Sequence, residues 1–598
     1  MRFALRQEMG FNGDTQNQRS YDPSVMRMFA LVAAGVAAVG AATAMAAGPG
    51  SAKAADTGEI TFNRDLAPVI FSHCAPCHRP GGTGPFALLR YGDARRHAKE
   101  MAEVTANRIM PPWLPAPGHG ELMDSRRMNE AEVRLFQRWL AGGTLEGATE
   151  KLPPIPIFPS GWQLGEPDLV VRMREPYELG PEGADVYRNF VVPLPLNSNR
   201  FVQAFEFRPG NPSVHHVRIL LDRTGQCRRL DELDPEPGFG GMNVPARFPP
   251  GQLLTWAPGR QPRRHAPELI WLLEAGSDLV LQIHLQRSGK KEIIQPEIGF
   301  YFTDVPPSKT AFVMGMVAQL IDIPDGATNY TVTRNLELPV DVKLLAVMPH
   351  AHYLAREVRF KATFPDETSR SLLWIPRWDF NWQEEYRYQQ PVPLPRGTRL
   401  EFAIRYDNSA ANIRNPNHPP RRVLFGPQST DEMGELWLQV LPDDTNDLAV
   451  LQREKRLMDS RETAAYYENF LQTHPDDAPS HVGLGKVLGP LGQTAAAARH
   501  FRRALELNPG QAEAHYYLGL IFLDERHFPE ARAQFDAELL VNPDYYKAYV
   551  ALGTVCIEEQ NLDQAEMQVR AALRINPKDP GVQQMLARIV KARAGARP

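Results

Sequence analysis

Cysteine is scarce in this chain, which has only four among its 598 residues. Two of them, Cys227 and Cys556, lie far apart in different predicted domains, so we expect two single buried thiols rather than a disulfide. An excess of either charge is also lacking: the net charge is −4, and the absence of a basic footprint argues against nucleic acid as a partner. No segment after residue 55 is long and apolar enough to span a bilayer.

Hydrophobic residues make up 43% of the chain, an ordinary proportion for a globular protein with sizeable cores. At roughly 100–200 residues per domain, the length predicts about three to five domains. We therefore expect a multidomain protein with several separate cores.

The first 55 residues predict an export signal. Arg27 precedes an Ala/Val-rich stretch that ends in the small-residue pattern Ala52-Lys53-Ala54, which is typical of a secretory signal peptide cleaved near Ala54. Residues 1–25 are polar and unusual for a leader, so Met26 and Met28 are alternative start positions. An uncleaved membrane anchor is the alternative to cleavage. Either interpretation puts the body of the protein in the periplasm or outside the cell. Cleavage of the signal peptide would leave no transmembrane segment in the mature chain.

Cys74, Cys77 and His78 form the pattern C-x-x-C-H, which is typical of c-type haem attachment. The two thiols bond covalently to the haem and the histidine supplies the proximal nitrogen to its iron. A thioredoxin-like pair and a chance disulfide are the alternatives. Helices are expected at residues 60–78 and 129–143, so we predict a small all-α cytochrome c domain at residues 56–150. The apolar positions of the second helix are Val133, Phe136, Trp139 and Leu140.

A sixth haem ligand is expected in the same domain, and Met110 is our prediction for it. Met110 lies in the sequence RIMPPW, where two prolines favour a non-helical loop that presents the thioether inward. Met101, Met123 and Met128 are the alternatives, together with a five-coordinate or His-ligated iron.

The middle of the chain predicts antiparallel β-sheet. A proline-rich linker at residues 151–163 precedes strand-like runs punctuated by Gly, Pro and Asn. These runs are residues 185–194, 200–207, 214–222, 278–286, 329–338, 342–353 and 356–364. We predict two antiparallel β-sandwich domains of jelly-roll type, at residues 164–305 and 306–443, with the break near Val305-Pro306-Pro307.

Six side chains within these two domains are candidate metal ligands. In His350-x-His352 the period of a strand places both rings on one face, where one metal ion can bind both. Adjacent His215 and His216 point to opposite faces of a regular strand, so a shared ion requires a strand end, a bulge or a turn there. The remaining candidates are His284 and Met433. Imidazole with a thioether suits copper better than zinc, calcium or magnesium.

The segments HHVRILLDRTG, DLVLQIHLQRSGK, MPHAHY and DEMGELW occur in this order and together resemble the type II copper monooxygenases, the peptidylglycine- and dopamine-hydroxylating family, over residues 160–443. The resemblance implies two sandwiches whose copper ions face each other across a solvent-filled cleft. It implies an electron-transfer copper on His215, His216 and His284. It also implies an oxygen-activating copper on His350, His352 and Met433.

Two departures from that family bear on the substrate. Its peptide-amidating members have an arginine two residues before the HxH pair and a tyrosine four residues after the copper methionine, and both hold the substrate carboxylate. Here the two positions are Met348 and Trp437, which favours a neutral or apolar small substrate. The family's disulfides cannot form with four cysteines. Arg405, Tyr406 and Asn408 are candidates for the cleft wall, with a turn as the alternative role of Asn408.

The last domain, residues 444–598, predicts a helical solenoid. Small residues and prolines recur every 34 positions, which is the period of tetratricopeptide repeats. The recurring residues are Gly485, Gly519 and Gly553; Ala497, Ala531 and Ala565; and Pro475, Pro509, Pro543 and Pro577. Such a solenoid predicts a protein partner. Its aromatic side chains, Tyr516, Tyr517, Tyr546 and Tyr549, are candidates for a peptide groove or, more simply, for the core.

Taken together, these features predict a copper-dependent monooxygenase with two copper ions and one covalently bound haem c. It would hydroxylate a C–H bond with O2, and an external donor would supply electrons through the haem, first to the His215, His216 and His284 copper. The main alternative is a non-catalytic periplasmic haem and copper protein for electron transfer or copper handling. In a further alternative, bound copper oxidises only a small reductant.

Overall fold

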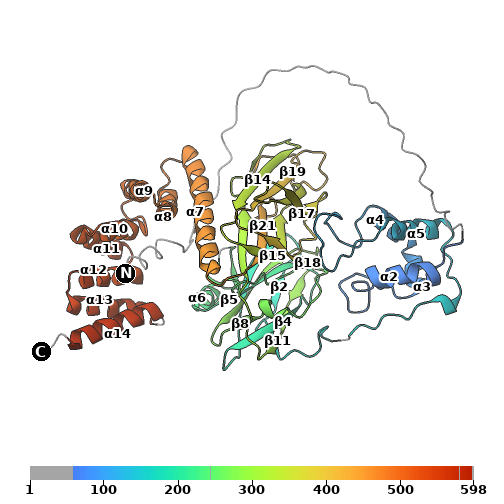
Figure 1. Ribbon diagram of the computed structural model, residues 1–598, viewed down its shortest axis with the longest axis horizontal. Helices are drawn as coiled ribbons and strands as arrows, with labels where there is room; N and C mark the ends of the chain where they lie inside the picture. The colour runs from blue at the N-terminus through green and yellow to red at the C-terminus, as the bar shows by residue number, and fades with distance from the viewer. Residues whose placement is uncertain (1–57, 160, 243, 578, 596–598) are drawn as a thin grey trace, which may run out of the picture.

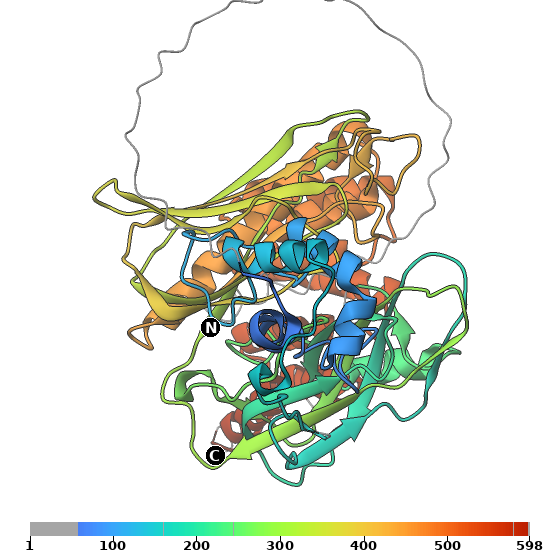
Figure 2. The same cartoon turned by 90° about the vertical axis from the view of Figure 1, so that its right-hand side faces the viewer.

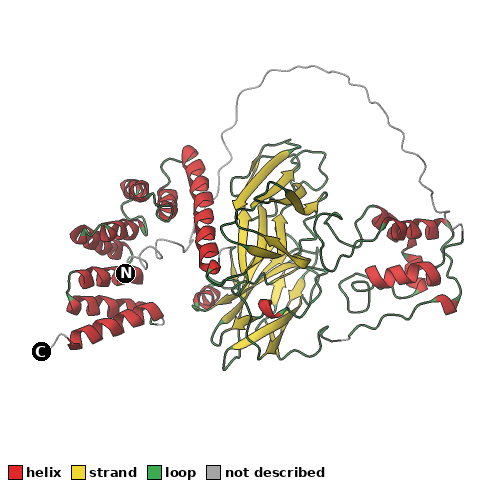
Figure 3. Ribbon diagram, viewed as in Figure 1, coloured by secondary structure: helices red, strands yellow, loops and turns green. Residues whose placement is uncertain are grey.

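The computed structural model describes residues 58–159, 161–242, 244–577 and 579–595. Strands occupy the middle of the chain and helices lie on either side of them (Figure 3). The protein is multidomain, with separate hydrophobic cores in its N-terminal, middle and C-terminal parts. The predicted leader, with its cleavage near Ala54, lies outside the described residues.

The N-terminal part is helical. It consists of the π-helical turn η1 (Phe62–Leu66), α2 (Ala67–His73), α3 (Tyr91–Arg96), α4 (Ala98–Ala106), α5 (Glu130–Ala141) and the short 3-10 turn η2 (Thr149–Lys151). A capping box starts α5, since the Asn129 side chain accepts from the backbone of Glu132 while the Glu132 side chain accepts from the backbone of Asn129. Phe136 and Trp139 of α5 are buried in the helical core as predicted, but Leu140 is 36% exposed because it lies at the edge of the apolar face.

The first β domain consists of two antiparallel sheets that share one core. One sheet has the order β1-β11-β4-β8, from β1 (Leu169–Arg172), β4 (Arg200–Arg208), β8 (Trp271–Leu273) and β11 (Glu297–Thr303). The other has the order β6-β3-β9-β5-β7, from β3 (Val186–Pro193), β5 (Val214–Asp222), β6 (Phe239–Gly240), β7 (Thr255–Trp256) and β9 (Asp278–Leu285). The minor elements are β2 (Tyr177–Leu179), β10 (Glu292–Ile294), α6 (Gln226–Leu233) and η3 (Pro267–Leu269).

The second β domain repeats this plan after residues 304–311. One sheet has the order β12-β21-β15-β18, from β12 (Phe312–Val317), β15 (Val342–Ala351), β18 (Tyr386–Leu394) and β21 (Gly434–Pro442). The other has the order β14-β19-β16-β17, from β14 (Tyr330–Glu337), β16 (Ala355–Thr363), β17 (Ser369–Ile375) and β19 (Arg399–Tyr406). The short strands β13 (Asp322–Ile323) and β20 (Val423–Leu424) pair with each other. The two four-stranded sheets face each other across one apolar core, as a sandwich.

The C-terminal part is a stack of helical hairpins. Its helices are α7 (Asp447–Thr473), α8 (Ala478–Leu488), α9 (Thr494–Leu507), α10 (Ala514–Asp524), α11 (Phe528–Val541), α12 (Tyr546–Glu558), α13 (Leu562–Ile575) and α14 (Pro580–Gly595). Gly485 and Gly519 recur because a Cβ there would lie 2.6–2.7 Å from the ring of Phe501 or Phe535 on the second helix of the hairpin. Cys227 and Cys556 are both buried free thiols, as predicted.

Helix α7 belongs to two cores at once. Leu451 is fully buried in the core of the second sandwich, and Met458 packs against the same core. Further along the helix, Ala464 and Tyr467 are part of the core of the helical stack. The helix therefore links the second sandwich directly to the helical stack. In Figure 1 it stands between the strands and the other C-terminal helices.

The N-terminal part docks on the second sandwich through residues 113–126. Its backbone bonds to β17 and β18, with Ala116 N donating to Trp374 O at 2.8 Å and Met123 N to Arg387 O at 2.8 Å. The Trp113 ring meets the ring of Tyr386 edge-on at 5.5 Å, and Arg126 forms a half-buried ion pair with Glu384. Viewed from that side, the N-terminal helices lie in front of the two sandwiches (Figure 2).

Glu385, next to this contact, joins the two sandwiches, and its ion pairs should make their stability depend on pH. Its buried carboxylate pairs with Arg260 of the first sandwich at 2.8 Å and with Arg387 at 2.5 Å. Burial alone would raise the pKa of Glu385, but the two guanidinium groups outweigh it and lower the pKa to about 2. Because the pKa is depressed in the fold, the stabilisation is complete above the unfolded value, near 4.5, and is lost as pH falls toward 2.

We expect Glu385→Gln to destabilise the sandwiches by about 3 kcal/mol at pH 7, since each pKa unit corresponds to about 1.4 kcal/mol. Denaturation of the variant and the wild type at pH values from 7 down to 3 measures this. The gap between the two proteins should narrow below pH ~4.5. A gap that does not change with pH would show that the ion pairs contribute nothing to it.

In the described part of the chain no helix has both the length and the apolar character needed to cross a membrane.

Candidate metal centres

Three imidazoles meet on the five-stranded sheet of the first sandwich, on β5 and β9. β5 has an irregular register against β9 between Val214 and His216, which is the bulge that two adjacent histidines need in order to face one point. The Nδ1 atom of His215 lies 3.1 Å from Nδ1 of His216 and 3.1 Å from Nδ1 of His284. One nitrogen from each ring lies within 4.8 Å of the others, so the three can bind a single ion.

Asp185 fixes the tautomer of His284. Nε2 of His284 donates to the Asp185 carboxylate at 2.9 Å, which leaves Nδ1 as a bare lone pair directed at the other two rings. Burial raises the pKa of Asp185, but the hydrogen bond from His284 outweighs it, so the net shift is downward and the carboxylate is ionised. The Tyr187 ring stacks on His284 at 4.2 Å and restrains its orientation. A carboxylate behind the histidine is the usual outer partner of a metal ligand.

The other two rings of this set are neutral. Burial lowers the pKa of His215 to about 3, with a smaller contribution from His284, and it lowers the pKa of His216 well below its ordinary value. The buried Nε2 atom of His215 has no hydrogen-bond partner among the described residues. Neutral rings whose lone pairs converge repel one another unless a cation lies between them, so the donor set fits a metal.

His350 and His352 form the second set. His350 lies near the end of β15 and His352 just beyond it, with ring centroids 5.3 Å apart. Nδ1 of His350 bonds to Oε1 of Gln383, and Nδ1 of His352 bonds to the carbonyl of Asp431 at 3.1 Å. Both partners are acceptors, so the Nδ1 atoms carry the protons and the Nε2 lone pairs are free for a metal.

Met433 immediately precedes β21, the strand that pairs with β15. The register pairs Ala351 with Gly434, so the next residues, His352 and Met433, come to the same end of the two strands. The hydroxyl of Tyr406 donates to the Met433 carbonyl at 2.7 Å and holds this end in place. Asn408 bonds to the carbonyls of Pro324 and Arg421 instead of lining a cleft, and Arg405 pairs with Glu357.

Glu432 joins the two segments that carry this second set. Its buried carboxylate accepts from the backbone N–H groups of His352 at 2.9 Å, Leu354 at 2.6 Å and Met433 at 3.2 Å. Burial raises its pKa to about 8, although the backbone N–H bonds oppose that shift. Glu432 therefore sets the relative position of His352 and Met433.

Glu432→Ala should destabilise the second sandwich by about 3 kcal/mol or more, because three buried N–H groups lose their acceptor at about 1–3 kcal/mol each. It should also weaken metal binding by His350, His352 and Met433. Thermal denaturation and metal titration of the purified variant measure the two effects. Glu401→Ala, which removes an exposed ion pair with Lys361 on the same sandwich, is the control and should stay within about 0.5 kcal/mol of the wild type.

The two ligand sets are adjacent. The rings of His216 and His350 lie 6.3 Å apart, and the Phe380 ring contacts His215 at 4.9 Å and His352 at 5.7 Å. A solvent-filled cleft between the sets was expected from the resemblance. The Phe380 ring contacts one ring of each set, and a cavity lined by Arg218 and Met242 of the first sandwich and by Met433 of the second lies between the two sandwiches.

Cys74, Cys77 and His78 follow α2 in a tight turn, with His78 N bonding to Cys74 O at 2.8 Å. Both thiols are free, and burial raises the pKa of Cys74 to about 12. Nδ1 of His78 lies 3.1 Å from the Phe86 carbonyl, so it carries the proton and Nε2 is free for iron. Met110 is half-buried in the loop after α4, whereas Met101 and Met128 lie in the helical core. The choice among these methionines as sixth ligand stays a prediction.

Met348 and Trp437 pair directly across β15 and β21. Gly315 on β12 leaves room for the indole, since a Cβ there would lie 3.0 Å from it. Trp437, Met433 and Glu435 line a large cavity. Phe380 and Gln383 lie outside every predicted strand run. Asp185 starts the predicted run 185–194 and Glu432 stands in the DEMGELW segment, but no spacing rule marked either residue as a partner of the ligands.

Comparison with known proteins identifies tetratricopeptide repeats in the C-terminal helices. Tetratricopeptide repeat models match residues 482–526 and 523–589. A crystal structure of the MamA protein is 21% identical with a TM-score of 0.21, covering 23% of this chain and 74% of MamA. The first TPR of Spaghetti (RPAP3) bound to an HSP90 peptide is 19% identical with a TM-score of 0.19, covering 20% of this chain and 93% of that one. None of the curated proteins matches the chain.

Proposed function

We propose that this protein is a copper-dependent monooxygenase that hydroxylates a C–H bond with O2, with electrons supplied through a covalently attached haem c. The observation that carries the proposal is the convergence of the Nδ1 atoms of His215, His216 and His284 beside a second set that presents Nε2 atoms near a methionine. The tetratricopeptide repeats at residues 482–589 predict a protein partner.

The donor chemistry favours copper at both sets. Three converging imidazoles, with an ionised Asp185 behind His284, suit a borderline-soft ion, and a thioether beside His350 and His352 favours Cu(I). Copper bound there would supply one-electron redox chemistry and a place for O2. The protein's own part is to hold the imidazoles in fixed tautomers, through Asp185, Gln383 and the Asp431 carbonyl.

The haem proposal is supported by the place at which the N-terminal part docks. Cys74, Cys77 and His78 would hold the haem, which would supply single electrons. The loop on which residues 113–126 dock includes Glu384, and the same loop carries Gln383 against His350 and Phe380 against His215. The docking site is therefore next to both sets of metal ligands, and this supports electron delivery from the attached haem to the His215, His216 and His284 set.

The wall around Met433 supports a neutral or apolar reacting group. Met348 and Trp437 add apolar surface where a carboxylate-binding pair would lie, and the Trp437 Nε1 hydrogen is taken by Glu435 at 2.8 Å. A free carboxylate therefore lacks both a cationic and a hydroxyl partner at these two positions.

The alternative is a non-catalytic haem and copper protein for electron transfer or copper handling. The burial of His352, at 1% exposure, favours it, since a copper that only transfers electrons has no need of substrate access. It retains every ligand and differs only in the use of O2. In the third interpretation copper oxidises a small reductant and no C–H bond.

Metal analysis with EPR on protein matured with haem tests the proposal first. We expect two copper ions and one haem per chain; zinc, or a single copper, would contradict it. Incorporation of labelled oxygen from O2 into product then separates the monooxygenase from both alternatives. Met433→Leu should abolish product formation and leave the haem spectrum intact. Met242→Leu, in the wall of the same cavity, is the matched control and should retain product formation.

A further inference from the structure

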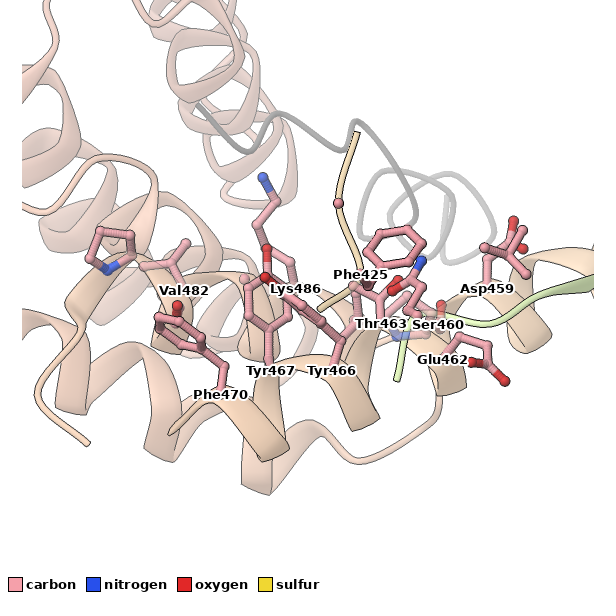
Figure 4. A pocket seen from close by; sticks show the side chains of 18 of the residues that line it. Phe425, Asp459, Ser460, Glu462, Thr463, Tyr466, Tyr467, Phe470, Val482 and Lys486 are labelled. Atoms are coloured by element: carbon pink, nitrogen blue, oxygen red, sulfur yellow. The ribbon is translucent and has the colours of Figure 1, made fainter. Parts of the chain in front are cut away.

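One large cavity, with a volume of about 1810 Å³, has walls from both sandwiches and from the helical stack. On the helical side its wall includes Tyr466, Phe470 and Lys486, which face the space from α7 and α8 (Figure 4). On the sandwich side Arg218 of β5 and Glu435 of β21 line the same space from different domains. We call this part of the cavity, between β5 and β21, the sandwich end. It is bordered by one cation and one acid.

Arg218 is held in place by a row of side chains across the five-stranded sheet. The register places Arg218 of β5 opposite Gln282 of β9, and Gln282 opposite Asn189 of β3. Nη1 of Arg218 donates to Oε1 of Gln282 at 2.9 Å, and the Phe248 ring lies 5.2 Å from the guanidinium carbon. Nε2 of Gln282 donates in turn to Oδ1 of Asn189 at 2.9 Å and to a backbone carbonyl at 3.0 Å. Gln282 and Asn189 are buried, so this bonded row fixes the guanidinium group against the sheet.

The same row lies next to the first set of metal ligands. Side chains two positions apart on a strand point to the same face, so Arg218 shares a face of β5 with His216. Arg218 and Glu435 also both act on His350 of the second set. Burial lowers the pKa of His350, Glu435 raises it and Arg218 lowers it further. The cation and the acid are therefore both close to the metal ligands.

Both charged groups have hydrogen-bonding capacity left over. A guanidinium group has five N–H donors. Among the described residues, Nη1 is the only guanidinium nitrogen of Arg218 with a hydrogen-bond partner, and Arg218 forms no ion pair there. On Glu435, Oε2 accepts from Nε1 of Trp437 at 2.8 Å, and Oε1 has no partner in the described part of the chain. None of these unpaired atoms is fully buried, so they are accessible from the cavity.

The chemistry of the sandwich end selects a neutral group. Met433, Trp437 and Val317 add apolar surface around the two charges. A carboxylate would be attracted by Arg218 but repelled by Glu435, and for an ammonium group the two effects are reversed. A carboxamide has a carbonyl acceptor and an N–H donor without a net charge, and its transfer from water costs less than that of an ion. A carboxamide therefore matches both charged groups at once.

We propose that the sandwich end binds a neutral carboxamide group on an apolar body. The carbonyl oxygen accepts from the free N–H groups of Arg218, and the amide N–H donates to Glu435. Arg218 is then a specificity-determining residue on the first sandwich, whereas the substrate contacts of the resembled peptide-amidating enzymes map to Met348 and Trp437 of the second. The role of the amide in catalysis rests on the proposed function, in which it holds the substrate while the apolar body presents its C–H bond beside Met433. The binding itself does not depend on oxygen chemistry.

The test uses the full-length, copper-free protein and probes that share one phenyl body: 3-phenylpropanamide, 3-phenylpropanoate and 3-phenylpropylammonium. We expect the amide to bind about 10-fold or more tightly than either ion, because each ion faces one like charge. The zwitterion L-phenylalanine is a further probe and should also bind more weakly than the amide, because two charges must leave water. Ligand-observed NMR titration measures the dissociation constants.

Two variants locate the amide. Arg218→Met should weaken binding of 3-phenylpropanamide about 10-fold or more, whereas Arg223→Met, which removes an exposed arginine of the same sandwich, should not change it. Glu435→Gln removes the like charge that a carboxylate meets, so 3-phenylpropanoate should bind this variant about 10-fold more tightly than the wild type. A purely structural role of Glu435 would not produce this gain. Thermal melting verifies that each variant is folded.

Tighter binding of any of the charged probes than of the amide to the wild type would overturn the proposal, and so would binding of none of them. An amide affinity that Arg218→Met leaves unchanged would place the probe elsewhere and overturn it too. Because neither copper nor O2 chemistry enters this experiment, its failure is distinct from a failure of the proposed hydroxylation.

Discussion

His216→Ala is expected to lower the copper content from two ions per chain to one. The Nδ1 atoms of His215, His216 and His284 converge on one point, and removal of one of three ligands leaves a two-coordinate site. The loss of affinity should exceed the roughly 10–100-fold that follows loss of an outer partner. Elemental analysis after dialysis against a copper chelator measures the content, and EPR shows which copper remains.

Two further variants make this prediction specific. Asp185→Asn keeps all three imidazoles but weakens the acceptor of His284 Nε2, so copper should be retained and bind about 10–100-fold less tightly. His515→Ala removes a histidine that bonds to Gln534 in the repeats, and both coppers should remain. If His216→Ala retains two coppers, the three-histidine set does not bind the metal.

Cys77→Ser is expected to leave at most one thioether, through Cys74, and to lower the haem content of the purified chain. A serine hydroxyl forms no thioether, so the second covalent bond to the haem is lost. Haem staining of the denatured chain and the redox spectrum of the native protein measure attachment. Cys227→Ser, at a fully buried thiol in the first sandwich, should leave the haem unchanged.

The copper content of Cys77→Ser should stay at two per chain, because the metal ligands lie on the sandwiches and pack in separate cores from the N-terminal helices. A wild-type protein that carries no haem after maturation, and whose two thiols instead form a disulfide, would favour the thioredoxin-like interpretation of the motif.

Periodic features of the sequence predicted structure well. Gly485 and Gly519 recur at the helical crossing because each hairpin needs the same small residue against the same ring. The strand alternation predicted the irregularity at His215 and His216, since only a bulge turns two neighbours toward one ion. The 34-residue period and the alternation of side chains along a strand are both local rules, so they can be read from the order of residues alone.

Loop contacts were not predictable in this way. The Phe380 ring contacts one ring of each ligand set, and Gln383 bonds to His350 across 33 positions of sequence. Neither residue belongs to a periodic run, and their positions depend on how strands far apart in sequence pair. Leu140 has the helical spacing of the apolar positions of α5, but it is 36% exposed because the helical core does not extend far enough to cover it.

The predicted domain boundary at residue 443 does not separate two independent folding units. A protein truncated there would lose Leu451 and Met458, and the sandwich would expose an apolar strip that α7 covers in the full chain. Deletion or exchange of the repeats should therefore begin only after residue 458. Any recombination that moves the two sandwiches between proteins must carry the first half of α7 with them.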